Sequence, residues 1–218
     1  MKLAIFDLDN TLLNGDSDHA WGEFLSERGL VDPVEYRNTN NQFYQDYLKG
    51  ELDIIAYQTF CLNIIKNRPL EEILSWRDDF ISNKITPMLL EKAQQLIKKH
   101  QSAGERPIII TATNRFITEP IAKLYDIDIL IATEPEFDGK LYTGEVVGTP
   151  CYREGKITRL EEWMKQNNST LDGSFFYSDS HNDLPLLKIV ENPVAVDPDE
   201  TLKRYAETNN WPIISLRD

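Results

Sequence analysis

The stretch Leu3-Ala-Ile-Phe-Asp-Leu-Asp-Asn-Thr11 decides the fold class of this chain. Four apolar residues closed by an aspartate are typical of a parallel strand that is buried on both faces. Further short apolar runs follow at 107–111, 127–132, 174–178, 194–196 and, more weakly, 213–216. Helical patterns separate these runs. Short strands that alternate with helices predict an α/β fold with a Rossmann-like open parallel sheet.

Residues 15–86 interrupt this alternation. Successive helical patterns occupy 16–28, 33–49, 53–67 and 70–83, separated by glycine and proline. Together they carry ten aromatic residues, which are most simply the core of a small helical bundle. We therefore expect an all-helical domain over 15–86, inserted into an α/β core that is formed by 1–14 and 87–218.

Composition narrows the possible partners and the location. The chain has 36 acidic and 23 basic residues and a formal net charge of -13 at pH 7, which disfavours binding to nucleic acid or to an anionic membrane surface. No apolar run approaches the roughly 20 residues of a membrane span, and Asp7 comes too early for a signal peptide. Two distant cysteines, Cys61 and Cys151, exclude a disulfide framework. These features predict a cytoplasmic protein.

Acidic and hydroxyl side chains follow three of the predicted strands. Asp7 and Asp9 close the first strand, Thr111 closes the second, and Asp179 and Asp183 follow the fourth. Ligands of an open parallel sheet bind at the carboxyl ends of its strands, so we expect these side chains to meet in one crevice. Four carboxylates so placed repel one another unless a cation neutralises them, and oxygen ligands suit Mg²⁺.

Each of these features has an ordinary explanation when it is taken alone. An Asp-x-Asp pair is more often a turn or a cap than a catalytic site, and Asp179 with Asp183 could cap a helix and complement its dipole. Lys156 opens a predicted helix after Gly155, where a lysine is usually solvated. Their joint occurrence, each acid or threonine directly after an apolar strand, favours a functional site.

These motifs, in this order, resemble those of the haloacid-dehalogenase-like hydrolases, and more narrowly the phosphoserine-phosphatase-like subclass, subfamily IB. The matching residues are Asp7-x-Asp9-x-Thr11, Thr111 after an isoleucine run, Gly155-Lys156, and Asp179-Ser-x-Asn-Asp183. The inserted helices correspond to the helical cap of that subclass, and a hairpin signal at Asp138-Gly139 also matches. Ser178 stands where the family usually has glycine.

The resemblance implies a Mg²⁺-dependent phosphomonoester hydrolase that forms an aspartyl-phosphate intermediate on a small phosphorylated metabolite. It implies Asp7 as the nucleophile and Asp9 as the acid/base. Thr111 and Lys156 would bind the phosphate, with Asn182 assisting. The implied metal ligands are Asp7, Asp9 through its backbone carbonyl, Asp179 and, through the water shell of the metal, Asp183.

The cap sequence bears on the substrate. In phosphoserine phosphatases an acid shortly after the first motif meets the substrate amine, and Asp16 can fill that role here. Those enzymes also use a cap arginine for the substrate carboxylate, whereas Thr59 aligns with that position and 53–66 contains no arginine. We therefore expect an amino alcohol phosphate such as histidinol phosphate. Phosphoserine is the alternative, with compensation from Arg68, Arg77 or Arg115.

Two other functions compete with this one. A dehalogenase of the same superfamily needs neither the second aspartate nor Mg²⁺, so Asp9, Asp179 and Asp183 argue against it. A non-enzymatic phospho-accepting or binding module would be shorter and would lack the inserted helices. We expect an enzyme whose partner is a small phosphate ester, acting as a monomer or homodimer.

Overall fold

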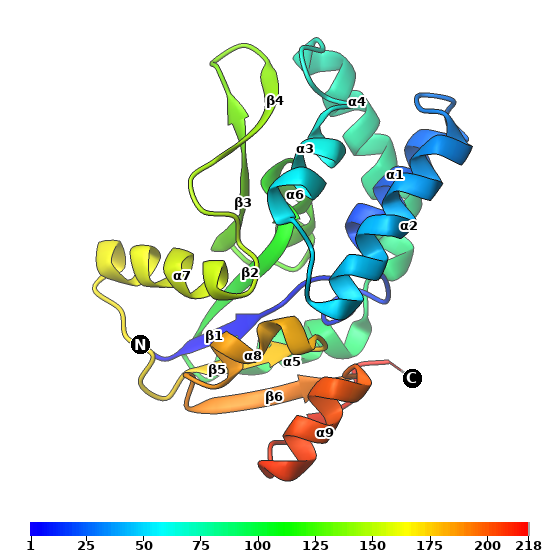
Figure 1. Ribbon diagram of the computed structural model, residues 1–218. Coiled ribbons are helices and arrows are strands. Elements are labelled where there is room, and N and C mark those ends of the chain that lie inside the picture. Colours follow the sequence, from blue (N-terminus) through cyan, green and yellow to red (C-terminus); the bar gives the residue numbers. More distant parts are fainter. Residues whose placement is uncertain (218) are drawn as a thin grey trace.

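The computed structural model describes residues 1–217, and its centre is a seven-stranded sheet with the order β4-β3-β2-β1-β5-β6-β7 (Figure 1). All neighbouring strands pair in parallel except β3 and β4. The predicted α/β fold with an open, mostly parallel sheet is confirmed. The strands are β1 (Leu3–Phe6), β2 (Arg106–Asn114), β3 (Leu130–Phe137), β4 (Tyr142–Val147), β5 (Phe175–Ser178), β6 (Asn192–Val196) and β7 (Ile213–Ile214).

Nine α-helices accompany this sheet within residues 1–217. A π-helical turn (Ile81–Ile85) and a 3-10 turn (Thr86–Met88) continue α4, and a second 3-10 turn (His181–Asp183) precedes α8. The α-helices are α1 (Ser17–Glu27), α2 (Pro33–Lys49), α3 (Ile54–Leu62), α4 (Leu70–Phe80), α5 (Glu91–Ser102), α6 (Arg115–Leu124), α7 (Glu154–Asn167), α8 (Leu184–Leu187) and α9 (Glu200–Thr208).

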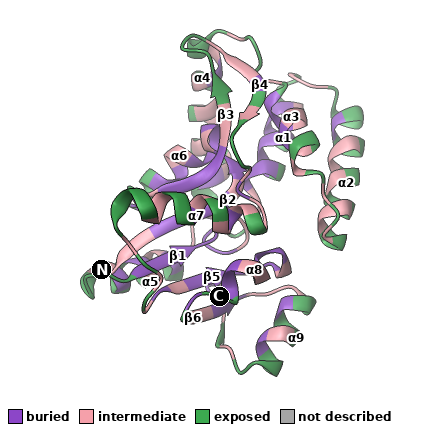
Figure 2. Ribbon diagram, turned by 60° about the vertical axis from the view of Figure 1, so that its left-hand side comes forward, coloured by how far each residue is buried: buried purple, intermediate pink, exposed green. Residues whose placement is uncertain are grey.

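The strands have two buried faces, which explains why they read as continuous apolar runs. Leu3 and Ile5 of β1 join a cluster with α7, α8 and α9, whereas Ala4 and Phe6 join a cluster with α1, α4, α5 and α6. Figure 2 shows the central strands buried and the outer faces of α2, α7 and α9 exposed. Successive side chains of a strand point to opposite faces, so each strand serves both cores.

The helices over 15–86 begin at aspartate caps. The side chains of Asp16, Asp32 and Asp53 accept backbone N–H groups in the first turns of α1, α2 and α3. Gly50 ends α2 in the left-handed region at φ 71. The predicted helix over 33–49 is confirmed. The predicted helix over 53–67 is shorter, because α3 ends at Leu62 and turns follow it.

The aromatic residues of these helices occupy different environments. Trp21, Phe24, Trp76 and Phe80 pack in the same apolar cluster as the β1 residue Phe6, so the interior of this region is continuous with that of the sheet. Tyr36 is also buried, and Phe60 packs against it. The expectation of a core position is wrong for Tyr44, which is 54% exposed. Phe43, Tyr47 and Tyr57 are partly buried and line a pocket together with Tyr44. The division into a cap over 15–86 and a core over 1–14 and 87–218 stays a proposal.

Two strands differ from their predicted bounds by more than two residues at one end or both. β2 continues to Asn114, so Thr111 lies inside it, because β3 pairs with β2 beyond the predicted end. The strand predicted at 127–132 is β3 at 130–137, since α6 and a turn through Asp126 at φ 56 occupy the preceding residues. The hairpin predicted at Asp138-Gly139 joins β3 to β4.

Among residues 1–217 no helix combines the length and the apolar character that crossing a membrane requires. Cys61 and Cys151 are both buried free thiols.

Candidate active site

A pocket of about 450 Å³ opens at the carboxyl ends of β1, β2 and β5. It lies between this edge of the sheet and the helices α1, α2 and α3, where the order of the strands reverses around β1. All eight site residues expected from the sequence line it, so the structure brings them together. They are Asp7, Asp9, Asp16, Thr111, Lys156, Asp179, Asn182 and Asp183.

A buried lysine lies at the floor of the pocket. The Lys156 Nζ donates to Asp7 Oδ1 at 2.8 Å and to Asp183 Oδ2 at 2.7 Å, and its side chain is 4% exposed. The Ser178 hydroxyl also donates to Asp183 Oδ2, at 2.7 Å. Burial opposes the charge of Lys156, but the carboxylates of Asp183 and Asp7 outweigh it and raise its pKa. The lysine therefore stays cationic and faces the end of β1.

The position of Lys156 depends on the glycine before it. The predicted helix begins at Glu154, two residues earlier than expected, so Lys156 lies in its first turn. A Cβ atom on Gly155 would lie 2.1 Å from the backbone oxygen of Pro150. Because this clash involves the backbone, the rotation of a side chain cannot relieve it. Only glycine lets the chain approach Pro150 and direct Lys156 into the pocket.

Asp7 and Asp179 share a hydroxyl group. Thr11 Oγ1 lies 3.0 Å from Asp179 Oδ1 and 3.5 Å from Asp7 Oδ2. Burial raises the pKa of Asp7 to about 7, against the lowering effect of Lys156 and with further increases from Asp183 and Asp9. Burial and the charge of Asp7 also raise the pKa of Asp179 well above its usual value. The two carboxylates are close enough to repel each other.

Asp9 leaves the strand direction and faces the same pocket. The chain turns directly after it, with Asn10 at φ 56. Its Oδ1 accepts the Ser17 backbone N–H at 2.7 Å, and its Oδ2 accepts the Thr113 hydroxyl at 2.8 Å. Burial, followed by the charge of Asp16, raises the pKa of Asp9 to about 6.

The oxygen atoms near Thr11 fit Mg²⁺. Within residues 1–217, no three side chains of His, Cys, Asp or Glu gather closely enough to hold a metal ion on their own. The adjacent carboxylates of Asp7 and Asp179 form a smaller set of hard oxygen donors that leaves coordination positions for water, as Mg²⁺ prefers. The part of the Asp9 backbone carbonyl in this set stays a prediction. Asp183 has Lys156 and Ser178 as its partners, and its support of the metal's water shell stays a prediction.

Helix α2 is tied to the loop after β5. The Tyr47 hydroxyl forms a hydrogen bond with Ser180 Oγ at 2.7 Å, and the Asn182 amide donates to the Tyr47 carbonyl at 3.3 Å. Arg153 donates to the Gly50 carbonyl at 2.6 Å. Asn182 thus holds the end of α2 as well as lining the pocket, and its assistance to the phosphate stays a prediction.

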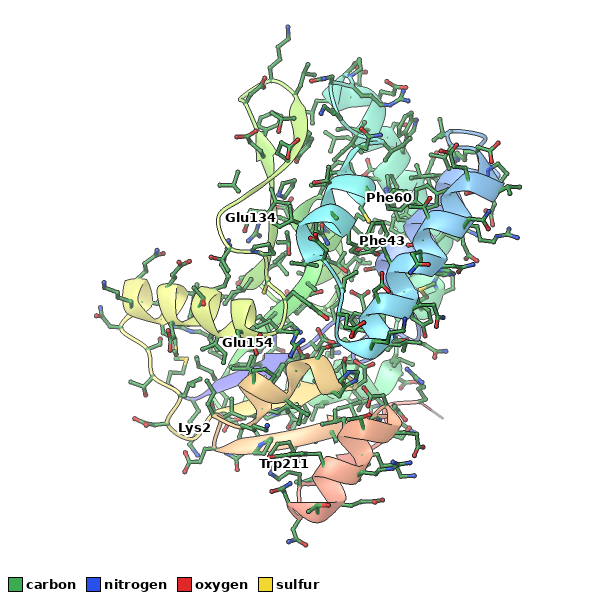
Figure 3. All side chains as sticks on the ribbon, viewed as in Figure 1. Lys2, Phe43, Phe60, Glu134, Glu154 and Trp211 are labelled. Carbon is green, nitrogen blue, oxygen red and sulfur yellow. The ribbon has the colours of Figure 1, made fainter. Side chains whose placement is uncertain are left out.

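The sequence did not reveal several side chains that line the other half of the pocket. Asp16 caps α1, accepting from the His19 N–H at 2.9 Å, and lines the pocket as expected. Asp18, which was not predicted, also lines it and is 5% exposed. The signal was present, because Asp18 precedes the buried Trp21 and Leu25 at helical spacing. Among the pocket residues, Phe43 of α2 faces Phe60 of α3 (Figure 3). The ring centroids of these two residues lie 5.6 Å apart.

A family model of haloacid dehalogenase-like hydrolases matches residues 4–188. The chain belongs to this family. The resemblance inferred from the motifs is therefore confirmed. This haloacid dehalogenase-like hydrolase is 44% identical over 221 residues to a histidinol-phosphatase of Neisseria meningitidis serogroup C (strain 8013), covering 99% of each chain. With the family match, this makes it a phosphatase and excludes the non-enzymatic alternative.

Solved structures agree with the fold of this hydrolase. A protein of unknown function from Bordetella pertussis Tohama I superimposes with a TM-score of 0.92 at 39% identity, covering 99% of this chain and 98% of that one. A phosphoserine phosphatase in a phospho-aspartyl intermediate analogue has a TM-score of 0.71 at 18% identity, with coverages of 99% and 93%. The second match concerns the fold alone.

Proposed function

We propose that this phosphatase hydrolyses the phosphate monoester of an amino alcohol, with Mg²⁺ and through an aspartyl-phosphate on Asp7, and that histidinol phosphate is its substrate. The observation that carries the reaction is the buried contact of Lys156 with Asp7 at the floor of the pocket. The full-length similarity to a histidinol-phosphatase supports the choice of substrate.

The proposed reaction takes place in two displacements. In the first, a carboxylate oxygen of Asp7 attacks phosphorus, the ester P–O bond breaks, and Asp9 gives its proton to the departing alkoxide. In the second, Asp9 takes a proton from a water molecule that attacks the aspartyl-phosphate, releasing inorganic phosphate and restoring Asp7. A pKa of about 6 suits Asp9 to both tasks, because it can lose and regain a proton near neutral pH.

The cations of the site would carry the phosphate charge. Lys156 is directed at Asp7 and would contact the phosphoryl oxygens during both displacements, while Thr111 would donate its hydroxyl to them. Asp7, Asp179 and the Asp9 carbonyl would hold Mg²⁺, which when bound neutralises charge on the transferred phosphoryl group.

The rim of the pocket favours a leaving group that carries an ammonium group and no carboxylate, unlike the serine of phosphoserine. Asp16 lines the pocket and would pair with an ammonium group. Three arginines that could have met a substrate carboxylate are engaged elsewhere: Arg68 with Glu72, Arg77 with the Phe116 carbonyl, and Arg115 with Glu134. Within residues 1–217, Arg217 is the single arginine that lines the pocket, and it donates to the Asn10 carbonyl at 3.0 Å.

The test compares kcat/KM for histidinol phosphate, phosphoserine and p-nitrophenyl phosphate, with Mg²⁺ and after treatment with EDTA. We expect histidinol phosphate to exceed phosphoserine by about a hundredfold, because a substrate carboxylate would enter an acidic pocket without a partner. EDTA should abolish turnover of all three esters, and Mg²⁺ should restore it. Phosphoserine turning over as well as histidinol phosphate would overturn the proposed substrate. Full turnover in EDTA would overturn the metal requirement.

A further inference from the structure

Asp18 has no part in the chemistry proposed above, although it lines the same pocket as Asp9. It lies in the first turn of α1, two residues after Asp16, and its side chain is 5% exposed. Aspartate is among the residues least often buried to this extent without a partner. Its place beside the reacting groups therefore requires an explanation.

The carboxyl group of Asp18 is only half satisfied. Its Oδ2 lies 3.3 Å from the Thr113 hydroxyl oxygen, whereas its Oδ1 is buried and accepts no hydrogen bond of normal geometry from residues 1–217. A buried acceptor without a donor destabilises the folded protein. Such a group inside a pocket marks the place where a ligand can supply the missing donor.

The Thr113 hydroxyl connects Asp18 to the site of proton transfer. The same oxygen lies 2.8 Å from Asp9 Oδ2 and 3.3 Å from Asp18 Oδ2, so these two carboxylates are neighbours. Asp9 would protonate the ester oxygen of the leaving group. The part of the leaving group that extends beyond this oxygen then lies beside Asp18.

The walls near Asp18 are aromatic and apolar. Phe43, Tyr44, Ile54 and Tyr57 line the same pocket, and the rings of Phe43 and Tyr57 lie 5.4 Å apart, edge to face. Burial raises the pKa of the Tyr57 hydroxyl, and the nearby charge of Asp18 raises it further, so these two groups are also close. Flat apolar walls with one buried acceptor suit a ring that carries an N–H, and they disfavour an anionic group.

We propose that Asp18 Oδ1 accepts the N–H of a nitrogen heterocycle in the leaving group, while Asp16 pairs with the ammonium group. The inference rests on the proposed function and narrows it. The substrates are phosphate esters of amino alcohols whose side chain ends in a heteroaromatic ring, and Asp18 is the residue that selects the ring.

The test uses two substrates that differ in the ring alone. Histidinol phosphate and phenylalaninol phosphate carry the same ammonium and phosphate groups, but only the first has ring nitrogens. The wild-type protein should prefer histidinol phosphate by about tenfold or more in kcat/KM, since an unpaired buried acceptor penalises the other ring. Asp18→Ala should reduce this preference to about twofold or less. Asp16→Asn, which keeps a good helix cap, should lower kcat/KM for both substrates and leave the ratio of the two values unchanged.

Glu23→Gln is the matched control. It removes an acid from the same helix α1, but Glu23 is exposed and does not line this pocket, so the preference should stay. Because Glu23 pairs with His19, which lines the pocket, Glu27→Gln on the same helix is the second control, since Glu27 pairs with Lys84 outside the pocket. Thermal melting verifies that each variant is folded, and Asp18→Asn serves if the alanine variant is not. The asparagine keeps an oxygen acceptor and should lose the preference only in part.

Binding of the dephosphorylated alcohols separates this inference from the proposed function. Calorimetry should give tighter binding of histidinol than of phenylalaninol to the wild-type protein and equal binding to Asp18→Ala. An unchanged preference in folded Asp18 variants, in both assays, overturns the role of Asp18 while turnover of histidinol phosphate still supports the function. Failure to hydrolyse either ester overturns the proposed substrate, and the calorimetric comparison still decides what Asp18 binds.

Discussion

The two halves of the pocket are held together in different ways. On the phosphate side every charged group has partners, as in the contacts of Lys156 with Asp7 and Asp183. On the leaving-group side Asp18 keeps an unpaired oxygen, and Tyr44 is 54% exposed. Groups that act on every substrate are preorganised. The groups proposed to recognise one substrate obtain their missing hydrogen-bond partner only when that substrate binds.

The largest effect is expected for a substitution on the phosphate side of the pocket. Asp7→Asn removes the nucleophile and should lower kcat by about a thousandfold or more on every phosphate ester. The substitution keeps the shape of the side chain and removes a buried negative charge, so the metal-free protein should melt no lower than the wild type. Asp172→Asn, at an exposed position, is the control. A wild-type rate in Asp7→Asn would assign the nucleophile to another residue.

Asp9→Asn acts where the two halves meet, and its effect should depend on the leaving group. An alkyl phosphate such as histidinol phosphate needs a proton on the departing oxygen, so kcat/KM should fall by about a hundredfold or more. Nitrophenolate leaves without a proton, and p-nitrophenyl phosphate should lose much less. Steady-state kinetics on the two esters measure the difference. Equal losses would remove Asp9 from the role of general acid.

Two glycines allow each half to be disturbed separately. Gly155→Ala would place a Cβ 2.1 Å from the Pro150 oxygen and displace Lys156, so activity should fall by about tenfold or more on all esters with little change in preference. Gly22→Ala would place a Cβ 2.3 Å from Tyr36 on α2 and shift the leaving-group side. Its effect should be greater on histidinol phosphate than on p-nitrophenyl phosphate. The opposite pattern would contradict the division of the pocket.

The smallest expected effect is a pH dependence of the stability of the metal-free protein, caused by the buried acids of the site. The pKa values of Asp7, about 7, and Asp9, about 6, both lie above the ordinary value of 3.8. Between pH 4 and pH 7 the folded state then binds more protons than the unfolded state, so its stability falls as pH rises. In EDTA the protein should melt at a higher temperature at pH 5 than at pH 7.5. The difference should be about 2–4 °C for each kcal/mol by which the free energy of unfolding falls between these two pH values. Melting that rises over this interval would contradict the raised pKa values.

Sequence reasoning succeeded where a strand determines a side chain's position. Asp7 and Asp179 follow buried strands directly, so the register of the sheet alone brings them together. The helix α6 was not predicted, and Pro120 inside it obscures its pattern. Asp18 was missed because it belongs to the pocket only once α1 packs against the sheet. Local periodicity predicts that such a residue is buried, but it does not reveal which groups it will face.

The attachment of α2 has a consequence for how new preferences could arise in this protein. Within this helix only Tyr36 is buried, and its end is fastened by the hydrogen bonds of Tyr47 and Gly50 to the loop after β5 and the start of α7. Phe43, Tyr44 and Tyr47, which line the pocket, therefore reside on a segment that contributes little to the shared interior. Replacing residues 33–52 by the same segment of a relative should therefore change the aromatic wall of the pocket, while Asp16, Asp18 and the groups proposed for phosphoryl transfer stay in place.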